Sequence, residues 1–161
     1  MKKLSFLLLL FVCSVSLAQQ EAKVNITDAL ALKTLTVSYE HYLTDQTSLG
    51  GSVLLNFEGE SSNFRYNEDQ MFTAFGRHYF STESLWNFFG EVFVAYNHGD
   101  DENGNTITDY SDIALGLAVG YKYISSGGFT ADFHVGLGRN LFTDDSPTLV
   151  PRAGVNIGFQ F

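Results

Sequence analysis

Three titratable side chains in the second half of the chain are of the types that general acid–base chemistry needs. They are Glu91, Asp132 and His134. Carboxylates and an imidazole that meet in a dry site acquire shifted pKa values and can transfer protons. The same side chains can also form a structural ion-pair core, because paired networks shift pKa values equally well. We favour the structural core, and the elements that carry these residues support that choice.

Those elements show the alternation that is typical of β-strands. From Ser111 to Tyr123, large apolar or aromatic residues occupy most of the alternate positions, and Asp, Ala, Gly and Lys occupy the positions between them. Helical spacing cannot produce this separation. A turn at Ser125 to Gly128 follows, and the next run, from Phe129 to Gly138, alternates in the same way. The pattern predicts a hairpin with one apolar and one polar face.

The whole chain from residue 19 onward predicts an all-β fold, an eight-stranded antiparallel up-and-down transmembrane β-barrel. Short and long connections alternate, with the long ones at 58–69, 98–110 and 141–149, as in barrels that cross the outer membrane. Seven runs are clear, and an eighth is assigned because single-chain bacterial barrels usually have an even strand number. The predicted strands are Ala22–Ala29, Thr34–Leu43, Ser48–Phe57, Gln70–Phe80, Trp86–Asn97, Ser111–Tyr123, Phe129–Leu137 and Val150–Phe161.

The beginning of the chain predicts export. Lys2 and Lys3 precede an apolar run that ends at Leu17, and a small-x-small site lies directly before Gln19. The run is shorter than the roughly 18 to 20 residues that a spanning helix needs. We therefore expect a cleaved signal peptide at 1–18 and a barrel domain at 19–161. Cys13 would leave with the signal peptide, so no disulfide or thiol chemistry is expected.

Short motifs relate the chain to a known class. Tyr39-Glu40 lies in an early strand, Arg77-His78-Tyr79-Phe80 ends another, and the last strand places Val155, Ile157, Phe159 and Phe161 on one face. The chain resembles the small barrels of Gram-negative outer membranes, of the OmpA-transmembrane-domain and OmpX type. More closely, it is similar to an uncharacterised family of short exported barrels. The resemblance implies location in the cell outer membrane, recognition of the strand ending at Phe161 by the assembly machinery, and no known reaction.

The inward face of the predicted barrel carries both signs of charge. An eight-stranded barrel is just wide enough for side chains to fill it, so we expect a paired polar network and no open pore. Small residues on two adjacent strands should leave room for Phe89, Phe93 and Arg152 from across the lumen. The small residues are Gly116, Ala118, Gly120, Gly136 and Gly138; the polar inward residues are Glu40, Asn56, Arg77, Glu91, Asp112, Lys122, Asp132, His134, Arg152 and Asn156. The register of Gln70 to Phe80 is left open by the sequence, because Arg77 and His78 point opposite ways and either could face in. Arg77 is placed inside because an Arg that faces lipid is costly.

Two other classes of protein stay open. A lipid A-modifying enzyme of the deacylase type would carry a His-x-Ser pair, but the residues two positions after the four histidines are Leu43, Phe80, Asp100 and Gly136. This disfavours a hydrolase and leaves a transferase with a scattered site. A periplasmic lipocalin-like barrel would turn its apolar residues inward around a ligand. The structural or interaction role in the envelope is favoured over both.

The remaining expectations concern the surface. Aromatic residues near strand ends predict interfacial girdles: Tyr39, Tyr42, Phe57, Phe72, Tyr79, Phe80, Trp86, Phe88, Tyr96, Tyr110, Tyr121, Tyr123, Phe129, Phe142 and Phe161. The long loops are acidic, with Glu58, Glu60, Glu68, Asp69, Asp100, Asp101, Glu102, Asp109, Asp144 and Asp145 against Arg65 alone. They are expected to be ordinary solvated loops, with two alternatives: divalent cations shared with lipopolysaccharide phosphates, or a basic partner.

The partners expected for such a surface are outer-membrane lipid and lipopolysaccharide. Eighteen acidic residues against nine basic ones argue against nucleic acid. We expect a monomer with no catalytic residues, no metal site and no cofactor.

Overall fold

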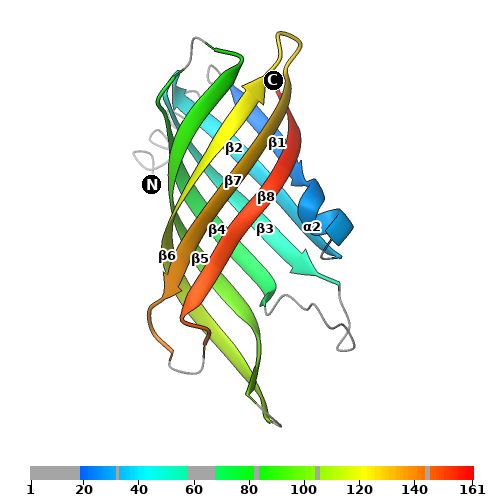
Figure 1. Cartoon of the computed structure of the whole chain (residues 1–161), viewed down its shortest axis with the longest axis vertical. Coiled ribbons are helices and arrows are strands. Elements are labelled where there is room, and N and C mark those ends of the chain that lie inside the picture. The colour runs from blue at the N-terminus through cyan, green and yellow to red at the C-terminus, as the bar shows by residue number, and fades with distance from the viewer. Residues whose placement is uncertain (1–18, 32, 58–67, 82–83, 104–105, 144–145) are drawn as a thin grey trace, which may run out of the picture.

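The computed structural model describes residues 19–31, 33–57, 68–81, 84–103, 106–143 and 146–161. The predicted signal peptide, including Cys13, lies outside the described residues. The strands form a closed barrel in which every neighbouring pair is antiparallel and sequential, from β1 to β8 and back to β1. The predicted eight-stranded up-and-down barrel is therefore confirmed (Figure 1).

The strands follow the chain in simple order, with one helix inserted after the first. Hydrogen bonds between Gln20 and Phe161 join the two ends of the barrel, at 3.0 and 2.8 Å. Among the described residues, no helix is long and apolar enough to cross a membrane. The bounds are β1 Gln20–Asn25, α2 Ile26–Ala31, β2 Thr34–Thr44, β3 Thr47–Asn56, β4 Glu68–Tyr79, β5 Trp86–Asn103, β6 Thr106–Ile124, β7 Phe129–Asn140 and β8 Leu149–Gln160.

The two faces of the wall differ in polarity as the alternation predicts. On β6, Leu117 is 66% exposed on the outer face, whereas Ala118 and Lys122 are buried inside. The outer face of β8 likewise exposes Phe159, at 53%. An apolar outer wall around a polar interior is the arrangement of a barrel that is solvated by lipid. It is the opposite of the lipocalin-like alternative, which needs the apolar face inside.

The first predicted strand is too long. β1 ends at Asn25, and the segment from Ile26 to Ala31 is helical. The Asn25 side chain explains the change, because its Oδ1 accepts the backbone N–H groups of Thr27 and Asp28 at 3.0 and 3.3 Å. Asn is a strong N-cap residue, and an acidic residue in the first turn adds to the helix signal.

The predicted long loop at 98–110 is also wrong. β5 continues to Asn103 and β6 begins at Thr106, and the two strands pair from Gly99↔Tyr110 to Asn103↔Thr106. Figure 1 shows this hairpin projecting beyond the ends of the other strands. Outside the lipid a strand needs no apolar outer face, so the alternation that marks the spanning part is lost there. β4 begins at Glu68, so Glu68 and Asp69 are strand residues as well.

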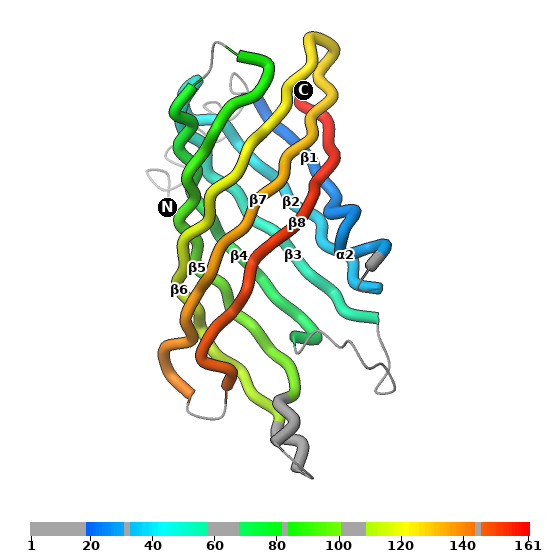
Figure 2. The backbone as a smooth tube through the Cα atoms, in the orientation of Figure 1, coloured from blue at the N-terminus to red at the C-terminus, as the bar shows by residue number. Residues whose placement is uncertain are grey.

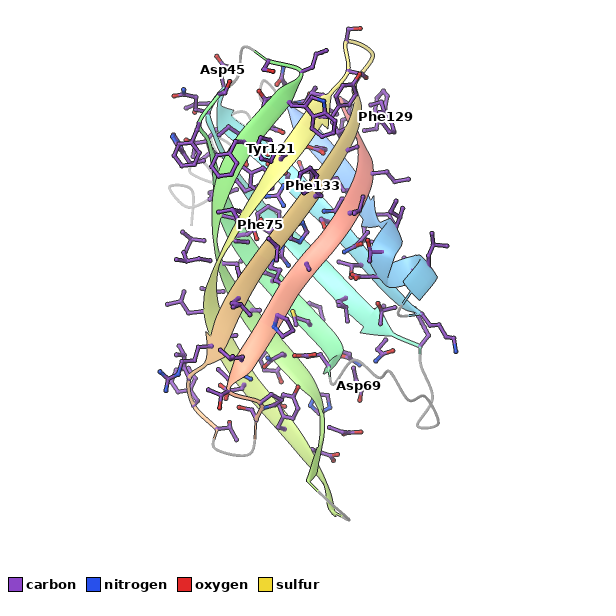
Figure 3. The ribbon with its side chains drawn as sticks, in the orientation of Figure 1. Asp45, Asp69, Phe75, Tyr121, Phe129 and Phe133 are labelled. Atoms are coloured by element: carbon purple, nitrogen blue, oxygen red, sulfur yellow. The ribbon has the colours of Figure 1, made fainter. Side chains whose placement is uncertain are left out.

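Aromatic side chains form a continuous group on the outer surface near the short-turn end. Phe88 contacts Tyr121 at a ring distance of 5.1 Å, and Tyr121 contacts Phe133 at 5.7 Å. Figure 3 shows Tyr121, Phe129 and Phe133 together in this part of the wall. The girdle prediction is wrong for three tyrosines, because Tyr42, Tyr79 and Tyr110 are buried. Tyr42 and Tyr79 point into the interior, where their hydroxyl groups find hydrogen-bond partners.

Candidate functional site

The interior of the barrel is organised around Glu40. One carboxylate oxygen accepts from Ser48 at 2.5 Å and from Tyr79 at 2.6 Å. The other accepts from Lys23 at 2.5 Å, from Lys122 at 3.1 Å and from Arg77 at 3.3 Å. Glu40 is fully buried. A buried charge of this kind is tolerated only when it is paired and hydrogen bonded, and Glu40 has both.

A second carboxylate, from the first strand, completes the short-turn side of the network. Glu21 accepts a hydrogen bond from Lys122 and another from Thr130, the latter at 2.6 Å. Tyr42 donates to the same group at 3.2 Å. Glu21 and Lys23 were not among the residues predicted to face the interior. The signal was present, because Gln20 to Asn25 alternates and its polar positions face the interior.

Arginines and aromatic rings fill the cross-section toward the long-loop side. Arg77 Nε donates to Glu91 at 2.6 Å, and Arg152 Nε donates to the other oxygen of Glu91 at 2.8 Å. The Arg77 guanidinium lies 4.2 Å from the Phe89 ring centroid and 4.9 Å from that of Phe75. These are cation–π distances. The packing agrees with the expectation of a filled interior.

The small residues on β6 and β7 make room for these rings, as predicted, but Phe89 and Phe93 come from the adjacent strand β5 and not from across the lumen. A Cβ at Gly116 would lie 2.3 Å from the Phe93 ring, and one at Gly120 would lie 2.6 Å from the Phe89 ring. Phe89 and Phe93 are buried, at 0% and 1% exposure. Glycine is required here because the ring of the neighbouring strand β5 occupies the space of a side chain.

The charges of this interior network balance. It contains four carboxylates, Glu21, Glu40, Glu91 and Asp132, and four cations, Lys23, Arg77, Lys122 and Arg152. Seven of the eight have a side-chain exposure of 1% or less, and Arg152 has 12%. A neutral, mutually paired set avoids the penalty of an isolated buried charge.

The candidate acid–base set is only partly assembled. His134 Nδ1 lies 3.5 Å from Asp132 Oδ1, but Glu91 is held between Arg77 and Arg152. Asp132 is itself paired with Lys23 at 3.1 Å. Among the described residues, no Ser or Thr hydroxyl is hydrogen bonded to His134. The geometry is that of an ion-pair core, without an activated nucleophile in the described part of the chain.

The other inward predictions are confirmed. Arg77 lies inside, which settles the register of β4, and Asn156 donates to Asp132 at 2.6 Å. Asn56 is half-buried, and its side chain donates to the Glu68 carbonyl at 3.3 Å.

Asp112 lies at the long-loop rim of the barrel and holds the connection that follows β7. It accepts from Phe142 N–H at 3.0 Å, from Thr143 N–H at 2.9 Å and from the Ser146 hydroxyl at 2.7 Å. Burial alone would raise the pKa of this carboxyl, but these hydrogen bonds outweigh burial and lower the pKa to about 2. Asp112 therefore organises a loop outside the membrane-spanning part of the wall.

Glu68, at the beginning of β4, was expected in an acidic loop but is buried. Its burial raises its pKa to about 7. No group of three or more metal-ligating side chains occurs among the described residues. Glu58, Glu60, Arg65, Asp144 and Asp145 lie outside the described residues, as do the side chains of Asp101 and Glu102, so the cation hypothesis stays a prediction.

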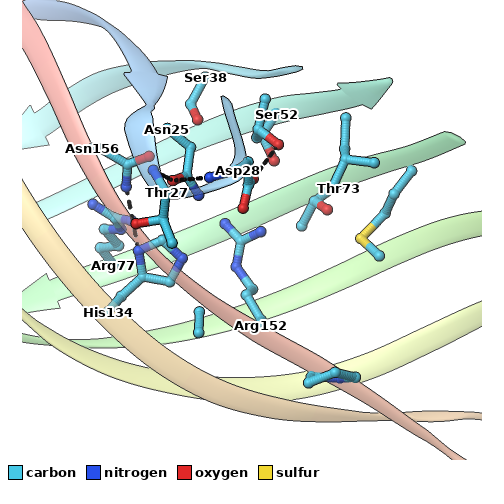
Figure 4. Close-up of a pocket in the computed structure, with 15 residues that line it drawn as sticks. Asn25, Thr27, Asp28, Ser38, Ser52, Thr73, Arg77, His134, Arg152 and Asn156 are labelled. Carbon is cyan, nitrogen blue, oxygen red and sulfur yellow. Dashed lines mark hydrogen bonds between the residues drawn. The ribbon is translucent and has the colours of Figure 1, made fainter. Parts of the chain in front are cut away.

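A cavity of about 170 Å³ lies beside the network, where α2 meets β8. Figure 4 shows Asp28, Arg77, His134 and Arg152 around it. Hydroxyl groups of β2, β3 and β4 form the far wall, together with two apolar side chains: Thr36, Ser38, Ser52, Thr73, Leu54 and Met71. The cavity combines charged, polar and apolar walls, as small-molecule sites do.

These features define a fold class, the closed and filled eight-stranded antiparallel barrel. Three solved structures are similar in fold. The N-terminal β-barrel domain of Pseudomonas aeruginosa OprF matches with a TM-score of 0.65 and 16% identity, covering 89% of this chain and 96% of that one. Neisserial surface protein A matches with a TM-score of 0.53 and 13% identity, covering 89% of this chain and 94% of that one. The Yersinia pestis outer membrane protein Ail, solved in a phospholipid bilayer nanodisc, matches with a TM-score of 0.51 and 12% identity. The match covers 89% of this chain and 99% of that one.

The sequence itself assigns the family. Residues 4–148 match the family described as protein of unknown function (DUF3575), so the chain belongs to that family. No curated protein sequence matches the chain.

Proposed function

We propose that this protein is a non-enzymatic, pore-less barrel of the Gram-negative outer membrane that presents the β5–β6 hairpin and its neighbouring loops outside the cell. The observation that carries the proposal is the contrast between the apolar outer wall and the neutral, side-chain-filled interior. A barrel plugged by Phe75, Phe89 and Phe93 has no continuous water path through its centre. The wall and the projecting ends of the barrel therefore carry its function.

The projecting hairpin supports an interaction role. β5 continues to Asn103, and β6 begins at Thr106. Both strands therefore extend well past the lipid-facing residues Tyr96 and Ile113. Outer-membrane lipid and lipopolysaccharide are the proposed surroundings of the apolar wall. The barrel is proposed to be a monomer, because its strands close on themselves and leave no unpaired sheet edge along most of the wall.

The last strand supports a proposed contact with the outer-membrane assembly machinery. Val155, Ile157, Phe159 and Phe161 are all exposed on the outer face, at 41%, 41%, 53% and 66%. An assembly factor can therefore contact these side chains while the barrel is being inserted. Deletion of Phe161 should lower the amount of protein in the outer membrane, and unchanged levels would contradict this contact.

The proposal is tested by cell fractionation combined with gel migration. We expect the protein in the outer-membrane fraction, with a band whose migration changes after heating because the closed barrel resists detergent until it is heated. Recovery as a soluble protein without a heat-dependent shift would contradict it.

Conductance tests the pore-less interior separately. In planar bilayers the protein should give no steady channel current. As a positive control, Phe75, Phe89 and Phe93 are replaced together by Ala, which removes the aromatic plug. A large, stable current from the unaltered barrel would contradict a closed interior even if the location is correct.

A further inference from the structure

The junction between the first and last strands is only half closed by strand pairing. β1 pairs with β8 through five residue pairs, from Glu21↔Gln160 to Asn25↔Asn156. The earlier part of β8, from Leu149 to Val155, pairs with β7 on one side and has α2 beside it on the other (Figure 2). We call this part of the wall, between α2 and residues Leu149 to Val155, the seam.

The edge of β8 at the seam is suited to having no partner strand on that side. Phe161 N–H donates to Gln20 and Val155 N–H donates to Thr27 Oγ1 at 3.1 Å, so the odd-numbered residues of β8 direct their N–H toward this side. Position 151 belongs to the same series and is Pro. Proline has no N–H, so it leaves no backbone donor unpaired at an edge that lacks a strand.

The cavity described above borders the wall at the seam. Arg152 and Asn156, from the inner face of β8, line it together with Pro151 and Ala153, which are exposed on the outer face. The cavity therefore lies directly against this part of β8. Thr27 of α2 lines it as well.

Two opposite charges face this cavity without touching. Asp28 Oδ2 accepts from the Thr36 hydroxyl at 2.5 Å, and no cation of the described residues lies within ion-pair distance of it. Arg152 uses Nε on Glu91, and its two terminal nitrogens donate to none of the described residues. Figure 4 shows the Arg152 guanidinium directed toward Asp28. The pair is therefore held apart by the cavity.

We propose that the seam cavity binds a phosphoethanolamine group, with its ammonium at Asp28 and its phosphate at Arg152. The planar guanidinium suits a phosphate, and the hydroxyl groups of Ser38, Ser52 and Thr73 supply neutral donors nearby. Asp28 repels a simple anion and Arg152 repels a simple cation, so a compact zwitterion satisfies both charges. Because the cavity borders the seam in the wall, the group can belong to a lipid headgroup or to the free compound.

Calorimetry on the folded barrel in a neutral glucoside detergent tests the recognition. O-phosphoethanolamine should bind at least about tenfold more tightly than ethyl phosphate or ethanolamine, because a charge-assisted hydrogen bond contributes that much or more. Asp28→Asn should reduce the affinity for O-phosphoethanolamine to that for ethyl phosphate. Asp45→Asn, at an exposed turn, is the matched control and should change nothing. Arg152→Lys keeps the positive charge but loses the planar guanidinium with its paired N–H donors. This variant should bind both O-phosphoethanolamine and ethyl phosphate with lower affinity.

Native mass spectrometry separates the two sources of the group. Preferential retention of short-chain phosphatidylethanolamine over phosphatidylglycerol identifies a lipid headgroup, and binding of the free compound without that preference identifies a soluble ligand. The proposal is overturned if neither form binds at millimolar concentration, or if Asp28→Asn binds O-phosphoethanolamine as tightly as the unaltered barrel. Heat-dependent gel migration of each variant shows that a loss of binding does not come from a loss of fold.

Discussion

The two faces of β6 differ in what stabilises them. On the outside, Ile113, Leu115, Leu117, Val119 and Tyr121 are between 39% and 66% exposed. On the inside, the same strand turns Ala, Gly and Lys side chains toward the centre. Lipid solvates the outer residues, so their burial in the membrane fixes where the barrel sits but does not hold its strands together. The interior must supply the internal contacts.

The interior does so largely with polar groups. In the part of the chain that the structure describes, the buried apolar residues form two small clusters, one around Phe75 and Phe93 and one of Tyr42, Tyr79 and Phe89. Between them lies the neutral ion-pair network centred on Glu40. The two faces of the wall have reversed roles relative to a soluble protein. Substitutions on each face should therefore fail for different reasons.

The largest effect is expected from Glu40→Gln. This change leaves Lys23, Arg77 and Lys122 with one carboxylate fewer in a buried site. The free energy of unfolding should fall by about 3 to 5 kcal/mol, because removal of one partner leaves an uncompensated buried charge. Urea unfolding in lipid vesicles, followed by the fluorescence of Trp86, measures it.

Asp45→Asn is the matched control for that measurement, because Asp45 is an exposed carboxylate. It should change the free energy of unfolding by less than about 0.5 kcal/mol. Equal losses for the two variants would contradict a central role for Glu40.

The next effect is expected on the other face, from Leu117→Arg. Leu117 is in the middle of the outward series of β6, and a charge there faces the lipid chains. We expect a loss of about 2 to 4 kcal/mol in vesicles. Leu117→Met keeps the apolar character and should be nearly neutral. A neutral Leu117→Arg variant would mean that this face does not contact lipid.

Asp112→Asn tests the inner face at the rim. The Thr143 N–H, bonded to Asp112 at 2.9 Å, should exchange with deuterium about tenfold faster or more, since a hydrogen bond to a charged acceptor contributes about 1.5 to 3 kcal/mol. The lowered pKa gives the sign of the pH dependence. The stabilisation is present above the ordinary pKa of Asp and is lost as the pH falls through about 2. Exchange that is unchanged in the variant would show that the loop does not depend on this carboxylate.

The smallest effect is expected from Gly138→Ala, which tests the packing of the interior. The added Cβ would lie 3.1 Å from the ring of Phe93. A loss of about 1 kcal/mol is expected, because the ring must shift. In a double-mutant cycle with Phe93→Leu the two losses should not add, since the smaller side chain relieves the contact. Additive losses would mean that the Phe93 ring does not contact position 138.

Much of this arrangement is predictable from the sequence because lipid imposes a strict alternation. The strand containing Ser111 to Tyr123 is unambiguous, and Arg77 could be placed inside on the cost of an arginine in lipid. Pairing of large rings with Gly116 and Gly120 also follows from the alternation and the small width of the barrel.

The departures occur where lipid stops imposing that pattern. The helix after Asn25 was missed because an even strand count called for a strand there, and the capping side chain was not considered. The β5–β6 hairpin was missed because its acidic residues suggest a loop, although strands outside lipid tolerate them. Tyr42 and Tyr79 were assigned to the girdle because sequence position does not tell which tyrosine hydroxyl has a buried partner.

The central claim is that the apolar face of the wall contacts lipid and the charged face fills the interior. With Cys13, the only cysteine, replaced by Ser, single cysteines placed along 113–121 can each carry a nitroxide label. In vesicles, collisions with dissolved oxygen should be frequent at the odd-numbered positions and rare at the even-numbered ones. Frequent collisions at the even-numbered positions, or no alternation at all, would contradict the account.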